Sequence, residues 1–376
     1  MTKSVADKGL RRELQGVQFL RAIAVLLVVA NHTLIILAGS EYFGSALIPQ
    51  AIAEKGAVGV DLFFVVSGFI IAYVSLTPDT LSAKVTVSRF IKKRLVRIVP
   101  LLWVAVLLFA LFRYVATHDV DVASSLNAMF VLPVGEQRPN VVWTLRHEFL
   151  FYALFAVSFL SLRGLRWVVY TWALSPLIVW PFLPALEGVS AEWARLLVGP
   201  SNVNFAVGLT VGLLYLRFRS LREAHISQAA AIAAIVVGVG GMVAARDALP
   251  VPFSALGGAL AIFGAIFCAS RSDLISRGLD TVGDASYAIY LTHNLGILAT
   301  AALWDRFFGP SGQGYATIVV FAVAVGAGVL VHFFVETPLI DGVNRFLSFL
   351  DRRTRPRQEG SRPDRRSRSK RQTKRA

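Results

Sequence analysis

Apolar stretches of 18 to 23 residues alternate with shorter polar segments along most of the chain. A helix needs about 20 apolar residues to cross the hydrocarbon core of a bilayer, so each stretch is a candidate span. Ten stretches cover residues 17–38, 58–76, 99–116, 141–162, 167–184, 199–216, 227–245, 253–270, 282–304 and 316–338. The pattern predicts an all-α polytopic membrane protein with about ten transmembrane helices.

The distribution of basic residues predicts the orientation of these helices. With the N-terminus placed in the cytoplasm, 31 of the 38 Lys and Arg fall on the cytoplasmic side, six fall outside, and Arg146 lies within a span. An excess of basic residues in cytoplasmic loops is the usual determinant of topology. We therefore expect both termini to be cytoplasmic.

The composition agrees with this class of protein and narrows the chemistry. Of the 376 residues, 55% are hydrophobic and only 16% are charged, whereas soluble domains carry about 25% charged residues. Cys268 is the single cysteine, which excludes an intrachain disulfide and a metal site built on several thiolates. No metal is expected.

The two ends of the chain differ from the apolar middle. Residues 351–376 hold twelve Lys or Arg and no large apolar residue, so they are typical of a disordered segment. We divide the chain into a membrane domain, 1–345, and a basic cytoplasmic tail, 346–376, that contacts anionic lipid headgroups; nucleic-acid binding is not expected. The first apolar stretch resembles a signal peptide, but its polar residues and the spans that follow favour an uncleaved first span.

Two ionisable residues lie on one face of the first span. Arg21 and His32 are eleven residues apart, which returns to nearly the same direction on an α-helix and separates them by about 16 Å along its axis. Arg21 is placed near the cytoplasmic edge, where it alone could extend to the interface. His32 lies deeper, and a buried ionisable group in a span is a functional candidate.

Carboxylates occupy two other spans. Asp61 is expected at a depth similar to that of His32, with Ser67 further along the same span. Glu148 lies in the fourth span with Tyr152 four residues later on the same face. Packing alone is the favoured explanation for Ser67, and an ion pair with Arg146 or with a cation of another helix would explain Glu148.

More polar residues gather toward the cytoplasmic side. Arg94 and Arg97 share a helix face, and arginine suits phosphate because its guanidinium binds two oxygens at once; topology and lipid contact are the alternative explanation. Glu336 at the end of the tenth span is a candidate partner for these arginines or for Arg21. In the ninth span Ser286, Tyr290 and His293 fall on one stripe, with His293 deeper.

Six of the seven tryptophans lie near span ends, as in an aromatic belt, although Trp143 or Trp304 could stack on a sugar ring.

These residues occur in motifs that resemble acyltransferase family 3 of integral membrane proteins over about residues 15–340. The motifs are Arg21 with His32 after ten intervening residues, "GVDLFFVVSGF", "RLVRIVP", "WTLRHEFLFY", "SYAIYLTH" and "VETP". The departures are Thr144 where serine is commoner and the Arg146–His147 pair ahead of Glu148.

The resemblance implies transfer of an acyl group, usually acetyl, from acyl-coenzyme A to a hydroxyl. The implied acceptors are cell-envelope or exported glycans, or lipid-linked sugars, and the implied location is the bacterial inner membrane. The resemblance further implies that Arg21 and His32 are the essential pair and that Arg94 and Arg97 act on the donor.

A mechanism can be built on this expectation. Coenzyme A phosphates would dock on Arg94, Arg97 and Arg21, and neutral His32 would take the proton of the acceptor hydroxyl. The pKa of a free histidine, about 6.5, suits that role. Asp61 or Glu148 would hold the ring tautomer and stabilise the imidazolium. A covalent acyl-enzyme route through Tyr152, Tyr290 or Ser67 is open as well.

Two other classes of function are compatible with parts of the sequence. Intramembrane His, Asp and Glu residues also form proton relays, as in a proton-coupled transporter or flippase. Transporters show inverted repeats and matching broken helices, and neither is evident here. The other alternative is a non-catalytic scaffold that recruits partners through its basic tail.

Overall fold

The computed structural model describes residues 2–161, 165–183, 187–246, 251–268 and 273–354, in which helices are joined by turns and loops. In those ranges β-structure is limited to an isolated bridge between Leu76 and Ala83. The longer α-helices are α1 (Thr2–Ala38), α3 (Val58–Ser75), α4 (Val87–Thr117), α6 (Trp143–Phe155), α10 (Val203–Arg217), α12 (Gln228–Ala245), α13 (Val251–Phe267), α15 (Ser286–Phe308), α16 (Gln313–Val331) and α17 (Thr337–Thr354).

Shorter helices connect these elements. They are α2 (Gln50–Ala53), α5 (Val122–Met129), α7 (Trp167–Leu174), α8 (Pro176–Val179), α9 (Gly188–Val198), α11 (Arg219–Arg222) and α14 (Leu274–Asp284), with 3-10 turns η1 (Glu54–Ala57), η2 (Asn140–Val142), η5 (Trp180–Phe182) and η6 (Pro200–Asn202). Two π-helical segments, η3 (Ala156–Ser161) and η7 (His332–Glu336), extend α6 and join α16 to α17.

Six helical stretches are long and apolar enough to cross a membrane, by length and composition. They are Gln15–Ala38, Gln50–Ser75, Val87–Thr117, Gly188–Arg217, Gln228–Ala245 and Gln313–Leu350. Shorter apolar helices occur at Trp167–Phe182 and Phe253–Phe267. The chain is therefore a polytopic helical protein, as the sequence predicts.

Several predicted boundaries differ from the structure. The prolines between residues 167 and 184 break the fifth predicted span into α7, α8 and η5, because an interior proline removes a helical hydrogen bond. α4 begins at Val87, twelve residues before the predicted span, so Arg94 and Arg97 lie in the long helix itself. α17 continues to Thr354, so the first residues of the predicted tail, 346–354, are helical; residues 355–376 lie outside the described residues.

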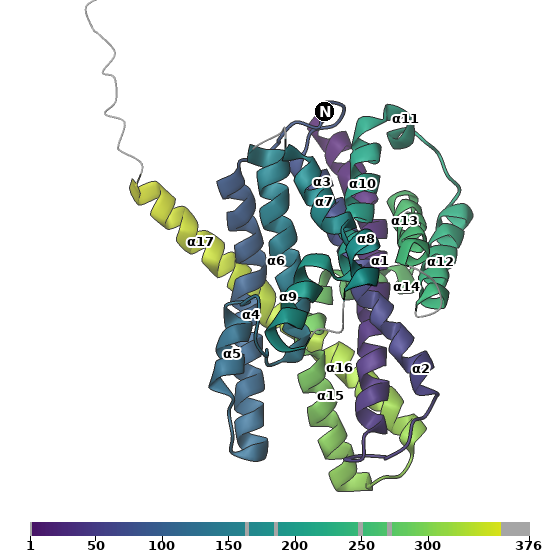
Figure 1. The fold of residues 1–376 in the computed structure, drawn as a ribbon, viewed down its shortest axis with the longest axis vertical. Helices are drawn as coiled ribbons and strands as arrows, with labels where there is room; N and C mark the ends of the chain where they lie inside the picture. The colour runs from purple at the N-terminus through teal and green to yellow at the C-terminus, as the bar shows by residue number, and fades with distance from the viewer. Residues whose placement is uncertain (1, 162–164, 184–186, 247–250, 269–272, 355–376) are drawn as a thin grey trace, which may run out of the picture.

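α1 runs through the middle of the bundle, with α12 and α13 on one side and α4, α5 and α6 on the other (Figure 1). The connections α1–α2, α4–α5 and α15–α16 lie at one end, and the N-terminus and α11 lie at the other (Figure 1). Apolar packing in the centre is largely aromatic. Phe205 of α10 stacks between Phe64 of α3 and Phe151 of α6, with ring centroids 4.4 and 4.6 Å apart.

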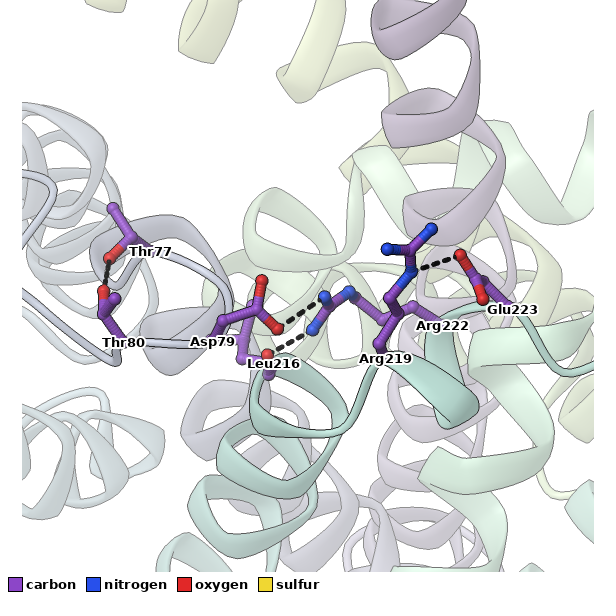
Figure 2. A network of polar contacts seen from close by, with 7 residues as sticks. All are labelled: Thr77, Asp79, Thr80, Leu216, Arg219, Arg222 and Glu223. Carbon is purple, nitrogen blue, oxygen red and sulfur yellow. Dashed lines mark hydrogen bonds and ion pairs between the residues drawn. The ribbon is translucent and has the colours of Figure 1, made fainter.

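A polar network fastens the α3–α4 connection to the α10–α11 corner (Figure 2). The backbone N–H of Asp79 donates to the carbonyl of Leu216 at 2.9 Å. Arg222 donates to the same carbonyl and, at 2.8 Å, to the Asp79 carboxylate. Arg219 and Glu223 form a neighbouring ion pair at 2.6 Å. These bonds fix the connection that leads into α4 and its arginines.

Small residues let α3 and α10 approach closely. A methyl group on Gly208 would lie 1.8 Å from the Val65 carbonyl oxygen, and one on Gly68 would lie 2.4 Å from that of Phe205. Glycine is common at such crossings because it allows backbones to touch. The crossing sets the position of the α3 face that carries Ser67.

Substitution of Gly208 by alanine should lower the stability of the bundle. The added methyl group must separate α3 from α10, and such overpacking costs about 1–3 kcal/mol. We expect a lower melting temperature for the purified protein in detergent. Gly240→Ala is the matched control, because nothing lies within 4 Å of the methyl group it adds. Equal melting temperatures for the two variants would contradict the assigned crossing.

Candidate functional site

A cavity of about 190 Å³ lies between α1, α3, α4, α6 and α15. Its wall combines apolar side chains of α3 with charged and hydroxyl-bearing side chains from the other helices. The polar lining residues are Arg21, Ser67, Arg94, Arg97, Thr144, Glu148, Tyr152, Ser286, Tyr287 and Tyr290. Residues from distant parts of the sequence therefore meet in one space, including seven of the eleven candidates that the sequence singles out.

Three arginines line the cavity, each in a different setting. Arg97 forms an ion pair with Glu336 at 2.7 Å. Arg21 donates to the side-chain carbonyl of Gln18 at 2.9 Å. Arg94 lies over the rings of Phe90 and Tyr152, 5.6 and 5.8 Å from their centroids. The three arginines outnumber the two nearby carboxylates, Glu148 in the cavity wall and Glu336 behind it, so the region keeps a positive charge that can accept an anion.

Glu336 supports the arginine side of the cavity from outside it. The residue is fully buried in the π-helical segment η7, and its second carboxylate oxygen lies 2.6 Å from Nδ1 of His332. Its other oxygen pairs with Arg97. The expected pairing of Glu336 with an arginine is thus confirmed, with Arg97 as the partner.

Glu148 lies in the same cavity as the arginines. Its carboxylate accepts a hydrogen bond from Ser67 Oγ at 3.0 Å and another from the Tyr152 hydroxyl. The expected shared face of Glu148 and Tyr152 is confirmed. An ion pair with Arg146 is not formed, because Arg146 instead donates to the Gly135 carbonyl on another face of α6.

His32 and His293 form a pair in the centre of the bundle. Nε2 of His293 lies 3.2 Å from Nδ1 of His32, and the ring centroids are 4.9 Å apart. Nδ1 of His293 faces the Tyr290 carbonyl at 2.7 Å, and Nδ1 of His32 faces the Val28 carbonyl at 3.0 Å. His293 is fully buried. The ring that contacts His32 is therefore an imidazole, and neither carboxylate takes this place.

The hydrogen-bond partners define the tautomers of the two neutral rings. A carbonyl oxygen can only accept, so Nδ1 of His293 carries the proton and its Nε2 has a free lone pair. Nδ1 of His32 then faces two acceptors, the Val28 carbonyl and His293 Nε2, and must carry a proton as well. The remaining nitrogen, Nε2 of His32, is left as a base.

Tyr290 stands between the cavity and the histidine pair. It lines the cavity, and its ring centroid is 5.9 Å from that of His293. Its hydroxyl lies 2.9 Å from both the Val141 carbonyl and Thr144 Oγ1. Phe63 packs edge-on against the ring at 5.8 Å. Tyr290 therefore links the wall of the cavity to His293.

Asp61 contacts neither the arginine-lined cavity nor the histidine pair. Its carboxylate accepts from Asn204 Nδ2 at 2.9 Å and pairs with Arg246 at 3.4 Å. These partners belong to α10 and to the end of α12, so Asp61 points away from the cavity face of α3. The expectation that Asp61 or Glu148 holds the His32 ring is therefore wrong in geometry, since His293 contacts that ring.

Tyr287 is a lining residue that the sequence argument missed. Its hydroxyl donates to the Ile98 carbonyl at 2.8 Å, and its ring lies 5.9 Å from the Arg97 guanidinium. Its position three residues before Tyr290 was the available signal, because such residues share a helix face. Within the described ranges, no group of three His, Cys, Asp or Glu residues is placed to hold a metal ion.

Comparison with known proteins finds a matching family and two similar proteins. Residues 14–336 match the family described as Acyltransferase domain. The exopolysaccharide production protein ExoZ of Rhizobium meliloti (strain 1021) is 32% identical over 303 residues, 76% of this chain and 90% of the relative. The acyltransferase MdmB of Streptomyces mycarofaciens is 27% identical over 362 residues, 85% of this chain and 89% of the relative. No solved structure matches the chain.

The tautomers of the histidine pair can be measured directly. In mildly alkaline buffer, ¹⁵N-histidine NMR of the protein in lipid should show His32 and His293 both protonated at Nδ1. His225, which is exposed, provides the reference for an unconstrained ring. Substitution of His32 by glutamine assigns the two signals. A proton on Nε2 of His293 would contradict the hydrogen-bond chain.

Proposed function

The chain belongs to this acyltransferase family, and we propose that it moves an acetyl group from acetyl-coenzyme A to a hydroxyl of a cell-envelope or exported glycan. The family match over residues 14–336 makes it a transferase of groups other than aminoacyl groups. The single observation that carries the finer proposal is the arginine-lined cavity whose wall residue Tyr290 packs against His293 of the histidine pair. The printed name of the relative ExoZ, an exopolysaccharide production protein, supports a glycan acceptor.

We place the protein in the bacterial inner membrane with ten spans and both termini in the cytoplasm. The distribution of basic residues supports this orientation, with 31 of 38 on the cytoplasmic side. In the same orientation Arg94 and Arg97 lie toward the cytoplasm, where acyl-coenzyme A is made. The basic tail would then meet anionic lipid headgroups.

The arginines are proposed to hold the donor by its phosphates. Arg94 faces aromatic rings, so its guanidinium is available for a bidentate contact with phosphate. Arg97 is held in place by Glu336, and Arg21 by Gln18. The acyl end of the donor would extend past Tyr290 toward His32.

We propose that His32 transfers the proton and that His293 acts as its hydrogen-bond partner. His32 Nε2 takes the proton from the acceptor hydroxyl as its oxygen forms a bond to the acyl carbon. The carbon–sulfur bond of the thioester breaks, and the proton passes from His32 to the thiolate. His293 accepts from His32 Nδ1–H throughout, so it orients the ring and stabilises the transient imidazolium, as a carboxylate does in other triads.

We propose direct transfer in place of an acyl-enzyme. The hydroxyls of Ser67 and Tyr152 both donate to Glu148, and that of Tyr290 is bonded to Val141 and Thr144. The free lone pair of the histidine pair lies on His32. Glu148 is assigned to positioning of the cavity wall, and Asp61 to the packing of α3 against α10 and α12.

Substitution of His32 by alanine should remove the transferase activity. Loss of a general base costs about 10²- to 10⁴-fold in rate. The measurement is release of free thiol from acetyl-coenzyme A by purified protein in lipid, with and without an envelope-glycan extract. His225→Ala, on an exposed loop, is the control. Turnover by a correctly inserted His32→Ala variant at the wild-type rate would refute the mechanism, and absence of turnover with any acyl donor would favour transport.

Substitution of Arg94 by alanine should weaken donor binding while leaving the chemistry in place. A charge-assisted hydrogen bond contributes about 1.5–3 kcal/mol, which corresponds to a rise of about ten- to a hundredfold in the KM for acetyl-coenzyme A. Arg89→Ala on the exposed face of the same helix is the matched control. The proposal fails if the two variants have the same donor KM.

A further inference from the structure

A second cavity of about 570 Å³ lies on another face of α6. It is bounded by residues 135–140, the first turn of α6 and the α9 helix. We call it the outer pocket, because its loops lie on the side that the charge distribution places outside the cytoplasm. Its lining includes the polar side chains of Gln137, Arg146, Glu192 and Arg195 together with the ring of Trp143.

The start of α6 is the wall between the two cavities. Thr144 and Glu148 line the arginine-lined cavity described above, whereas Trp143, Arg146 and His147 line the outer pocket. Asn140 lines the outer pocket and lies 3.4 Å from Asn294, the residue after His293. The outer pocket therefore borders α15, the helix that carries His293, across α6 from the cavity that holds Arg21, Arg94 and Arg97.

Two polar atoms of the pocket lining are buried without a partner. Gln137 is 6% exposed, and its Oε1 has no hydrogen-bond partner within the described residues, nor has Nε of Arg146. Buried polar atoms are paired with protein or water in almost all native structures, so these two atoms in the pocket wall are open to hydrogen bonds from a bound molecule. They are an acceptor and a donor, which a hydroxyl-bearing molecule satisfies together.

The aromatic residue defines the shape of this ligand. Trp143 is 40% exposed while it lines the pocket, and its ring meets His147 edge-on at 5.5 Å. His147 is fixed in turn by Asn202 at 2.7 Å. A rigid indole face beside charged and amide groups suits a molecule with an apolar face and a polar rim. The charged lining does not suit a lipid acyl chain, because desolvating it would be costly.

We propose that the outer pocket binds one sugar unit of the acceptor, stacked on Trp143 and hydrogen-bonded by Gln137 and Arg146. This assignment rests on the proposed function, because it gives the acceptor its own site opposite the donor. Donor and acceptor then approach the histidine pair from the two sides of the α6 wall. The acceptor does not cross the arginine cavity.

The test measures sugar binding without any acyl donor. Saturation-transfer NMR would be recorded on the protein in nanodiscs with methyl glycosides of glucose, galactose and N-acetylglucosamine. We expect the wild type to bind at least one of them and Trp143→Ala to bind it about tenfold or more weakly, with Trp143→Phe in between. Trp167→Phe is the matched control, since Trp167 is 60% exposed and lies outside the pocket. His32→Ala should bind as the wild type does.

The outcomes separate this inference from the transferase proposal. Glycoside binding that depends on Trp143 supports the pocket even if acetyl-coenzyme A turnover is absent. Turnover that depends on His32, together with no glycoside binding or binding that Trp143→Ala leaves unchanged, overturns the pocket and keeps the transferase. A folded Trp143→Phe variant, checked by its melting temperature, excludes misfolding as the cause of a loss. In turnover assays, Trp143→Phe should raise the KM for the glycan acceptor and leave the KM for acetyl-coenzyme A unchanged.

Discussion

The hydrogen bond between Nδ1 of His293 and the Tyr290 carbonyl is the contact on which the chemistry of this bundle depends. It determines which nitrogen of His293 is protonated, and so which nitrogen faces His32 as an acceptor. That acceptor in turn leaves a free lone pair on the far nitrogen of His32. The carbonyl belongs to the helix that carries His293 itself, so the backbone of α15 sets the direction of the proton transfer that we propose.

A neutral partner has a physical advantage over a carboxylate at this depth. A charged Asp or Glu beside His32 would be expensive to bury, whereas an imidazole that is already hydrogen-bonded to the backbone costs far less. Two other carboxylates of the bundle are placed beside cationic partners. Asp61 meets Arg246 and Asn204, and Glu336 meets Arg97 and His332.

The sequence predicted the fold class and many of the site residues because these depend on local properties. Apolar length indicated the helices, and helical spacing placed Tyr152 beside Glu148 on one face. The separation of Glu148 from His32 and the direction of Asp61 were not predictable in this way. They depend on how each helix is rotated against its neighbours, which the α3–α10 glycine crossing sets through long-range contacts. The outer pocket was also beyond reach, because α9 does not appear as a separate element in the apolar pattern.

Two faces of α6 line two different cavities because of helix geometry. A helix turns about 100° per residue, so Trp143 and Thr144 face different spaces although they are adjacent in sequence. One short helix can therefore contribute a wall to the arginine-lined cavity, where we propose that phosphate binds, and an aromatic surface to the outer pocket, where we propose that a sugar binds. Two substrates that are soluble on opposite sides of a membrane need to meet without opening a continuous channel. In the arrangement that we propose, α6 separates the two substrates and only their reacting groups meet, beside His32. The substrates can then react without a continuous channel through the protein.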